Sequence, residues 1–173
     1  MILTGPEIQR SWTAGEISID PFNPLHLNPN SYNFHLASRL VRVSRPDGQE
    51  TTSTIVLPKE GFVIEPGSLY LGATHERIGS SEYSMTLLGR SSIGRLGIFL
   101  NSTADLGHLG SDSNWTLEIS VVQAVRIFPL MRIGQVAFWT VEGQRLSYSG
   151  RYHNDTSPER SKDPRLVGKQ RDR

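Results

Sequence analysis

Cysteine is absent from this chain, lysine is rare and the net charge is small. Without cysteine the protein can form neither disulfide bonds nor thiolate metal sites, and the composition fits the reducing cytoplasm, where we expect the protein to be located. Lysine occurs only at Lys59, Lys162 and Lys169, so arginine supplies most of the positive charge. Arginine suits bidentate phosphate binding, although a codon bias of the genome explains this preference more simply.

An excess of one charge and long apolar runs are also lacking. The formal net charge is +1 at pH 7, which gives no overall field to attract nucleic acid or a membrane surface. No apolar stretch is long enough to span a bilayer, and the first residues lack the pattern of a signal peptide. For a length of 173 residues we therefore expect one domain with a real core and neither a nucleic-acid nor a membrane partner.

Short apolar segments separated by turn formers make up most of the chain. They predict strands at residues 17–19, 32–36, 40–43, 54–57, 62–64, 69–74, 116–122, 125–128 and 134–141. We also expect a hairpin turn at 46–48, burial of 96–100, and one helix that begins at the capping box Thr4-Gly5-Pro6-Glu7 and ends at Gly15. Many short strands with closely spaced turns predict an all-β sandwich or barrel.

The stretch 89–97 holds two arginines, two adjacent serines and three glycines, directly after the apolar run 85–88. This order predicts a strand that ends in a short turn of helix. Free backbone N–H groups at a helix start suit a phosphate, and the guanidinium groups of Arg90 and Arg95 match phosphate oxygens. In the alternative interpretation the serines only cap the helix.

A strand with a single carboxylate follows at residues 115–121. Its odd-numbered residues are apolar and its even-numbered residues, Glu118 among them, are polar. Because side chains alternate between the two faces of a strand, the apolar set can pack inward while Glu118 points into a cleft. The alternative is that Glu118 is an ordinary solvated residue.

These segments together resemble the dCTP deaminase branch of the trimeric dUTPase superfamily, over roughly residues 1–165. The resemblance rests on Asp20-Pro21-Phe22, Asn28-Pro29-Asn30-Ser31-Tyr32-Asn33, Gly89-Arg90-Ser91-Ser92 with Arg95 and Gly97, Trp115-Thr116-Leu117-Glu118, Ile133-Gly134-Gln135-Val136-Ala137-Phe138, Tyr148 and Gly150-Arg151-Tyr152. It implies a distorted β jelly roll or barrel of the dUTPase-like type, assembled as a homotrimer with active sites between subunits. Residues 1–165 would form one domain, in which a segment of about 147–165 closes over nucleotide, and we expect 166–173 to be disordered.

The resemblance also implies how the chemistry is done. Zinc deaminases need a His/Cys-ligated metal, and this chain has no cysteine. The spacing of its histidines is not that of metal ligands; they are His26, His35, His75, His108 and His153. We therefore expect no protein-bound metal, and in particular no zinc. Glu118 is expected to act as the general base and acid, with Ser91 and Arg95 assigned by the resemblance as its partners.

Further residues are expected to bind the substrate. By the resemblance, the triphosphate is contacted by Arg90 and Ser92 and, from the closing segment, by Tyr148 and Arg151. The backbone of Thr103 and Ala104 would line the base pocket, and His108 would lie near the sugar. Magnesium would be bound through the nucleotide phosphates and not by a protein cage.

The segment before Glu118 departs from the pattern of the family. His108 stands where an acid is usual, Ser111 replaces an aromatic residue, and Ser113 replaces a glycine. These changes lie at the sugar, phosphate and interface region more than at Glu118. They leave open a cytosine nucleotide other than dCTP, and they weaken the case for an additional diphosphatase activity.

Three functions follow from this sequence. The first is hydrolytic deamination of a cytosine deoxynucleotide, most simply dCTP to dUTP and ammonia. The second is dUTP diphosphatase activity, in which dUTP gives dUMP and pyrophosphate. The third is a catalytically silent trimer that only binds nucleotide.

Overall fold

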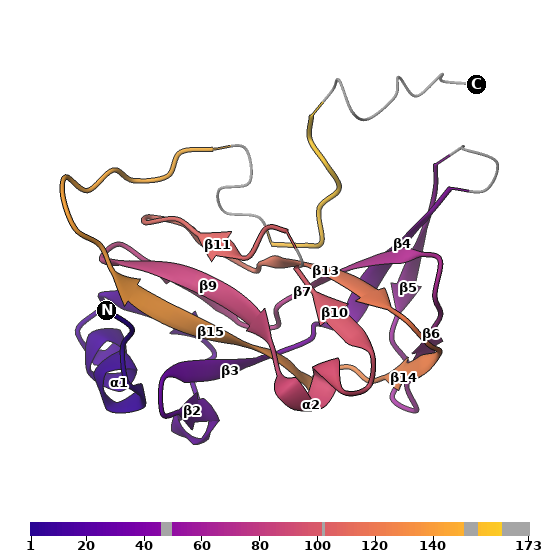
Figure 1. Cartoon of the computed structure of the whole chain (residues 1–173), viewed down its shortest axis with the longest axis horizontal. Helices are drawn as coiled ribbons and strands as arrows, with labels where there is room; N and C mark the ends of the chain where they lie inside the picture. Colours follow the sequence, from indigo (N-terminus) through magenta and orange to yellow (C-terminus); the bar gives the residue numbers. More distant parts are fainter. Residues whose placement is uncertain (46–49, 102, 151–155, 164–173) are drawn as a thin grey trace.

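The computed structural model describes residues 1–45, 50–101, 103–150 and 156–163. This part of the chain is mostly antiparallel β-structure with two short α-helices and one turn of 3-10 helix (Figure 1). The elements are α1 (Gly5–Thr13), β1 (Ile17–Asp20), η1 (Pro24–His26), β2 (Leu27–Asn28), β3 (Ser31–His35), β4 (Arg39–Ser44), β5 (Thr51–Val56), β6 (Phe62–Ile64), β7 (Leu69–Ala73), β8 (Arg77–Ser80), β9 (Tyr83–Gly89), α2 (Ser91–Gly94), β10 (Ile98–Leu100), β11 (Leu106–Gly107), β12 (Asp112–Ser113), β13 (Thr116–Val121), β14 (Val125–Ile127) and β15 (Arg132–Thr140).

Two five-stranded sheets form the body of the molecule. One has the strand order β10-β13-β7-β4-β5 and the other β11-β9-β15-β3-β2. A three-stranded sheet, β1-β8-β12, and the pair β14-β6 complete the fold. Neighbours within a sheet are often far apart in the sequence, as with β3 beside β15. The expected all-β class is therefore confirmed.

Inward-facing residues of both large sheets build the core. Tyr32 and Phe34 of β3 and Phe138 of β15 are fully buried, as are Tyr70 of β7 and Leu117 of β13. Burial of each large apolar side chain stabilises the fold by about 1.5–3 kcal/mol. The core thus holds β13 and β7 in place, and these two strands carry the pocket described below.

The N-terminal helix agrees with the prediction in its bounds but not in its cap. Thr4 is the N-cap residue, yet its side chain makes no capping hydrogen bond. Glu7 pairs instead with Arg10, with 2.7 Å between the carboxylate oxygen and Nε. The prediction of a capping box was therefore wrong. Gly15 follows the helix with a φ of +75°, a conformation that favours glycine.

The predictions of strands and of buried segments were confirmed only in part. The predicted strands are present, but β8, with the sequence Arg-Ile-Gly-Ser, was not predicted. Burial of 96–100 was wrong in part, because Leu96 is 47% and Phe99 48% exposed in this single chain. The hairpin turn at 46–48 and the tail 166–173 lie outside the described residues. Among the helices of the described part, none has the length and apolar character needed to cross a membrane.

Candidate active site

A pocket of about 640 Å³ opens beside β13, and Leu71 of β7 forms part of its wall. Four of the residues predicted from the sequence line it: Glu118, Ala104, His108 and Tyr148. The pocket therefore brings together residues from β13, from the segment around β11 and from the chain beyond β15. The apolar walls and the single strand-borne carboxylate suit a flat, polar-edged ligand.

Glu118 lies on β13, where the predicted alternation is confirmed. Leu117 and Ile119 are fully buried, whereas Glu118 is partly exposed. The register with β7 places Glu118 opposite Leu71. Because one face of the strand is fixed in the core, the Glu118 side chain is directed to the other face and into the pocket.

Asn101 holds the backbone of Glu118 from the opposite side of the strand. Its side-chain oxygen accepts a hydrogen bond from the Glu118 N–H at 2.8 Å, and its own N–H donates to the Glu118 carbonyl at 3.0 Å. Asn101 is buried and has a φ of +44°, which asparagine tolerates better than most residues. Sequence analysis did not find this residue; an isolated asparagine after an apolar strand carries no pattern that distinguishes it.

The Glu118 carboxylate itself has no hydrogen bond or ion pair to any described residue. The carboxylate therefore lines the pocket without a partner among the residues that the structure describes. This separates it from the acidic residues of the described surface that are engaged in ion pairs, such as Glu7 and Glu16 with Arg10.

His108 and Tyr148 form one wall of the pocket as a stacked pair. Their ring centroids are 5.4 Å apart and their planes differ by 22°. The Tyr148 N–H donates to the Leu109 carbonyl at 2.7 Å, which ties the segment after β15 to the segment after β11. Two stacked rings beside a cavity provide a flat surface against which a sugar or base can lie.

The segment 156–163 borders the same pocket. The Glu159 N–H donates to the Thr116 hydroxyl at 3.0 Å, and Arg160 pairs with Glu50. Glu159 and Arg160 both line the pocket. Sequence analysis did not single out Arg160; the only available signal was a second arginine in the expected closing segment.

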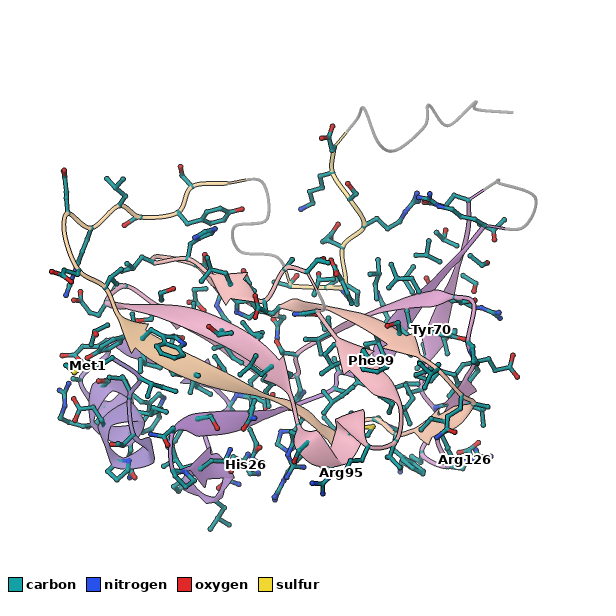
Figure 2. All side chains as sticks on the ribbon, viewed as in Figure 1. Met1, His26, Tyr70, Arg95, Phe99 and Arg126 are labelled. Carbon is teal, nitrogen blue, oxygen red and sulfur yellow. The ribbon has the colours of Figure 1, made fainter. Side chains whose placement is uncertain are left out.

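The arginine-serine segment lies elsewhere. The predicted short helix is present as α2, with Arg90 at its N-cap. Ser91, Ser92 and Arg95 are exposed, and neither they nor Arg90 line the pocket. Figure 2 shows Arg95 at the lower edge of the molecule, whereas Figure 1 shows the chain beyond β15 running above the sheets. Within one chain these residues are thus not brought to Glu118.

The remaining predicted binding residues divide between the pocket, the surface and the part not described. Ala104 lines the pocket, but its neighbour Thr103 is exposed and does not. Arg151 lies outside the described residues. Ser111 and Ser113, two of the positions that depart from the family pattern, line the pocket together with His108. These three departures from the family pattern therefore line the same pocket.

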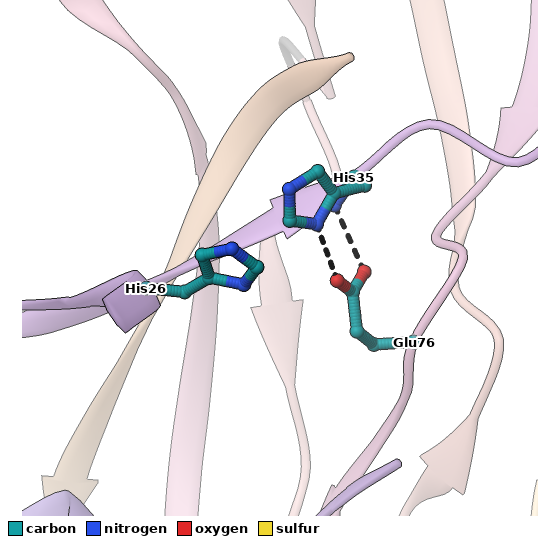
Figure 3. Close-up of side chains that lie close together, drawn as sticks. All are labelled: His26, His35 and Glu76. Carbon is teal, nitrogen blue, oxygen red and sulfur yellow. Dashed lines mark hydrogen bonds and ion pairs between the residues drawn. The ribbon is translucent and has the colours of Figure 1, made fainter. Parts of the chain in front are cut away.

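A second group of titratable side chains lies together in the fold, although the spacing of the histidines along the chain did not indicate it. His26, His35 and Glu76 offer ligand atoms within 4.8 Å of one another, as Figure 3 shows. Desolvation by burial, and then the charges of His35 and Arg132, lower the pKa of His26. Spacing along the chain did not reveal this group because antiparallel strands and loops bring distant residues together.

Comparison with known proteins identifies the family of the chain. The family model described as "dCTP deaminase-like" matches residues 2–141. The chain belongs to this family. Its fold is shared with the crystal structure of 2'-deoxycytidine 5'-triphosphate deaminase from Agrobacterium tumefaciens, with a TM-score of 0.65 and 22% identity over 79% of this chain. The present chain spans 47% of the length of that protein.

Two relatives illustrate the degree of similarity. The "dCTP deaminase, dUMP-forming" of Hathewaya histolytica is 42% identical over 161 residues, which cover 90% of this chain and 93% of that protein. The "dCTP deaminase" of Rhodopirellula baltica is 41% identical over 165 residues, 91% of this chain and 83% of that protein. The dUMP named for the first relative differs from the dUTP expected from the sequence.

Proposed function

We propose that this protein is a hydrolase that deaminates dCTP and releases the uracil nucleotide as dUMP. The balanced reaction is dCTP plus two waters to dUMP, ammonia and pyrophosphate. The observation that carries the deaminase proposal is the unpaired Glu118 carboxylate in the pocket of a dCTP deaminase-like chain. The dUMP product, in place of dUTP, is supported by relatives named dUMP-forming at about 40% identity.

Glu118 is the general base and acid of this proposal, and the deamination needs no protein-bound metal. Its carboxylate takes a proton from a water molecule as the water oxygen attacks C4 of cytosine, and delivers that proton to ring N3, where it stays. It then moves the remaining proton of the added hydroxyl to the amino group, which leaves as ammonia while C4 becomes a carbonyl. Acid–base catalysis of this kind contributes about 10²–10⁴-fold to the rate. The Asn101 contacts hold the backbone of Glu118, from which the carboxylate extends, in place on β13.

The site is completed by a second subunit in this proposal. Ser91 would orient the attacking water, and Arg95 would hold Ser91 and Glu118 in position, both from α2 of the neighbouring chain in a homotrimer. Exposed apolar side chains near α2 support a subunit contact there: Leu96, Phe99 and Val122 are 47%, 48% and 66% exposed. An active site shared between subunits accounts for the distance of α2 from the pocket of its own chain.

The nucleotide would be bound from several sides. Arg90 and Ser92 from the neighbouring α2 contact the phosphates, joined by Tyr148 and Arg151 from the segment beyond β15. Magnesium enters with the triphosphate, because it prefers phosphate oxygens and water to a protein cage. The Ala104 backbone borders the base, next to the His108 and Tyr148 stack.

The direct test is incubation of the protein with dCTP and magnesium. We expect ammonia, dUMP and pyrophosphate to appear in equal amounts, measured by an ammonia assay and by ion-exchange chromatography. The Glu118→Gln variant should bind dCTP as well as the unchanged protein but form almost no product. Absence of turnover on dCTP, dCMP and 5-substituted cytosine nucleotides would reject the deaminase and leave a nucleotide-binding trimer.

A second candidate is a deaminase that stops at dUTP. It is favoured by the departures His108, Ser111 and Ser113, which line the same pocket. In this case dCTP yields dUTP and ammonia without pyrophosphate, and dUTP added as substrate is left intact. Release of pyrophosphate from added dUTP would instead support the two-step reaction.

A further inference from the structure

His26, His35 and Glu76 form a compact group of potential metal ligands away from the proposed active site. One donor atom from each residue lies within 4.8 Å of the other two, and the two imidazole rings have centroids 4.5 Å apart. The group borders a second pocket, of about 460 Å³, that shares no lining residue with the pocket of Glu118. Figure 3 shows the His26 and His35 rings next to each other, with the Glu76 carboxylate beside His35.

Glu76 is fixed in the protein before any ion arrives. It is only 2% exposed, its Oε2 accepts a hydrogen bond from the His35 N–H at 2.8 Å, and its Oε1 lies 2.5 Å from His35 Nδ1. Its backbone carbonyl accepts a further bond from the Thr74 hydroxyl at 2.7 Å. A carboxylate held in this way is oriented toward the histidines and brings the negative charge that a cation requires.

His26 is held by the turn that carries it. The Asn23 side chain accepts a hydrogen bond from the Leu25 N–H at 3.0 Å, which stabilises the 3-10 turn. The Asn33 side chain donates to the His26 carbonyl at 3.3 Å. Both histidines are therefore presented by ordered backbone, one from η1 and one from the end of β3.

One ring nitrogen of His26 lacks a partner. Its Nδ1 is buried and has no hydrogen bond to any of the described residues. A buried polar atom in this state is unfavourable, and native structures often satisfy such an atom with a bound ion or water. Coordination of a metal would remove this cost.

We propose that His26, His35 and Glu76 bind one divalent transition-metal ion, with zinc as the best match. Two imidazoles and one carboxylate are a known ligand set for zinc, which leaves a fourth position for water. Ligands of one tetrahedral zinc stand about 3.3–3.6 Å apart, as follows from bond lengths of about 2.0–2.2 Å. The three donor atoms, which lie within 4.8 Å of one another, would move to this spacing, and the 2.5 Å contact between His35 Nδ1 and Glu76 Oε1 would open when the ion binds.

The charged groups around the site act on a bound cation in opposite directions. Glu76 supplies one negative charge, whereas Arg132 of β15 is near enough to act on His26 and opposes a cation. Hard ions such as magnesium prefer oxygen ligands, so the two nitrogen donors select against them. The ion would tie three segments together: η1, the end of β3 and the loop between β7 and β8.

Zinc alone is the probe for the first test. The full chain is stripped with a chelator, dialysed against zinc, and its metal content is measured by plasma mass spectrometry. We expect one zinc per chain, no retained magnesium, and an affinity that falls at least about tenfold in His26→Gln and His35→Gln. The matched control is His108→Gln, which removes a histidine from outside the group and should bind zinc like the unchanged protein. Equal zinc affinity in all four proteins would overturn the proposal.

A second measurement does not depend on the folding of the variants. A crystal of the unchanged protein grown with zinc should show an anomalous difference peak between the three side chains at the zinc absorption edge. Thermal unfolding of the unchanged protein should also shift to higher temperature with added zinc, because an ion that binds only the folded state stabilises it. A saturated crystal without a peak at this position would contradict the inference.

Discussion

Glu118 and Glu76 are two glutamates of one small fold with opposite surroundings. Glu118 is partly exposed on β13, and its carboxylate faces a pocket without a partner in the described part of the chain. Glu76 is almost fully buried and is held at both carboxylate oxygens by His35. A carboxylate without a partner is available for proton transfer, whereas one that already holds hydrogen bonds organises the structure around it.

The largest effect of a substitution on activity is expected at Glu118, whose carboxylate has no partner in the described part of the chain. Glu118→Gln keeps the shape of the side chain but removes the base, so kcat for deamination of dCTP should fall by about 10²–10⁴-fold. Because the carboxylate makes no bond within the described residues, the free energy of unfolding should stay within about 0.5 kcal/mol of its original value. Ammonia release and urea denaturation measure the two quantities, and a fully active variant would remove Glu118 from the mechanism.

The second largest effect on activity is expected from a substitution at the end of α2. Arg95→Ala should lower kcat by about 10²-fold, because a misplaced reacting group costs roughly that much. The exposed Arg95 side chain makes no hydrogen bond or ion pair to the described residues, and its backbone N–H, which donates to the Ser91 carbonyl at 3.1 Å, is kept in alanine, so the fold of each chain should be unaffected. The matched control is Arg39→Ala, an exposed arginine of β4 that lines neither pocket. An Arg95→Ala variant as active as this control would show that α2 takes no part.

Glu76 should behave in the opposite way to Glu118. Glu76→Ala leaves the His35 N–H without its acceptor in a buried place, and the free energy of unfolding should decrease by about 1–3 kcal/mol. Chemical denaturation in the presence of a chelator measures this effect without any metal contribution. Stability equal to that of the unchanged protein would mean that the hydrogen bonds of Glu76 do not organise the fold.

The smallest effect is expected at the wall of the pocket. His108→Ala removes the ring that stacks on Tyr148, and a stacked pair is worth about 0.5–1.5 kcal/mol. KM for dCTP should therefore rise by about 2–10-fold with little change in kcat, as steady-state kinetics would show. Ser149→Ala, at an exposed residue next to Tyr148, is the control and should alter neither constant. A large loss of kcat in His108→Ala would instead give this residue a part in the chemistry.

The sequence predicted features that depend on short spacings. Alternation along β13 placed Glu118 opposite the core face, and the order of glycine, serine and arginine after β9 predicted α2. Both patterns extend over a few residues and are decided by local geometry. The motifs named at these two places also carried the resemblance to the family that the comparisons then identified.

Features that depend on distant contacts were not predictable. His35 and Glu76 are 41 residues apart, and no local pattern joins them. Asn101 bonds to Glu118, which lies 17 residues further along the chain. Strand β8 was not predicted because its four residues include glycine and serine, which are not typical of strands. Leu96 and Phe99 look like core residues in the sequence, since composition alone does not distinguish a residue buried within one chain from one available for a contact between chains.

A mixing experiment tests most directly whether a free glutamate in one chain acts with α2 of another. Glu118→Gln and Arg95→Ala chains, each nearly inactive alone, are tagged differently, unfolded together and refolded into mixed oligomers. Random assembly then gives sites with both original residues at about a quarter of the positions. Deamination of dCTP should therefore return to about a quarter of the original rate. Mixed oligomers that bind dCTP but remain as inactive as their parents would contradict this expectation.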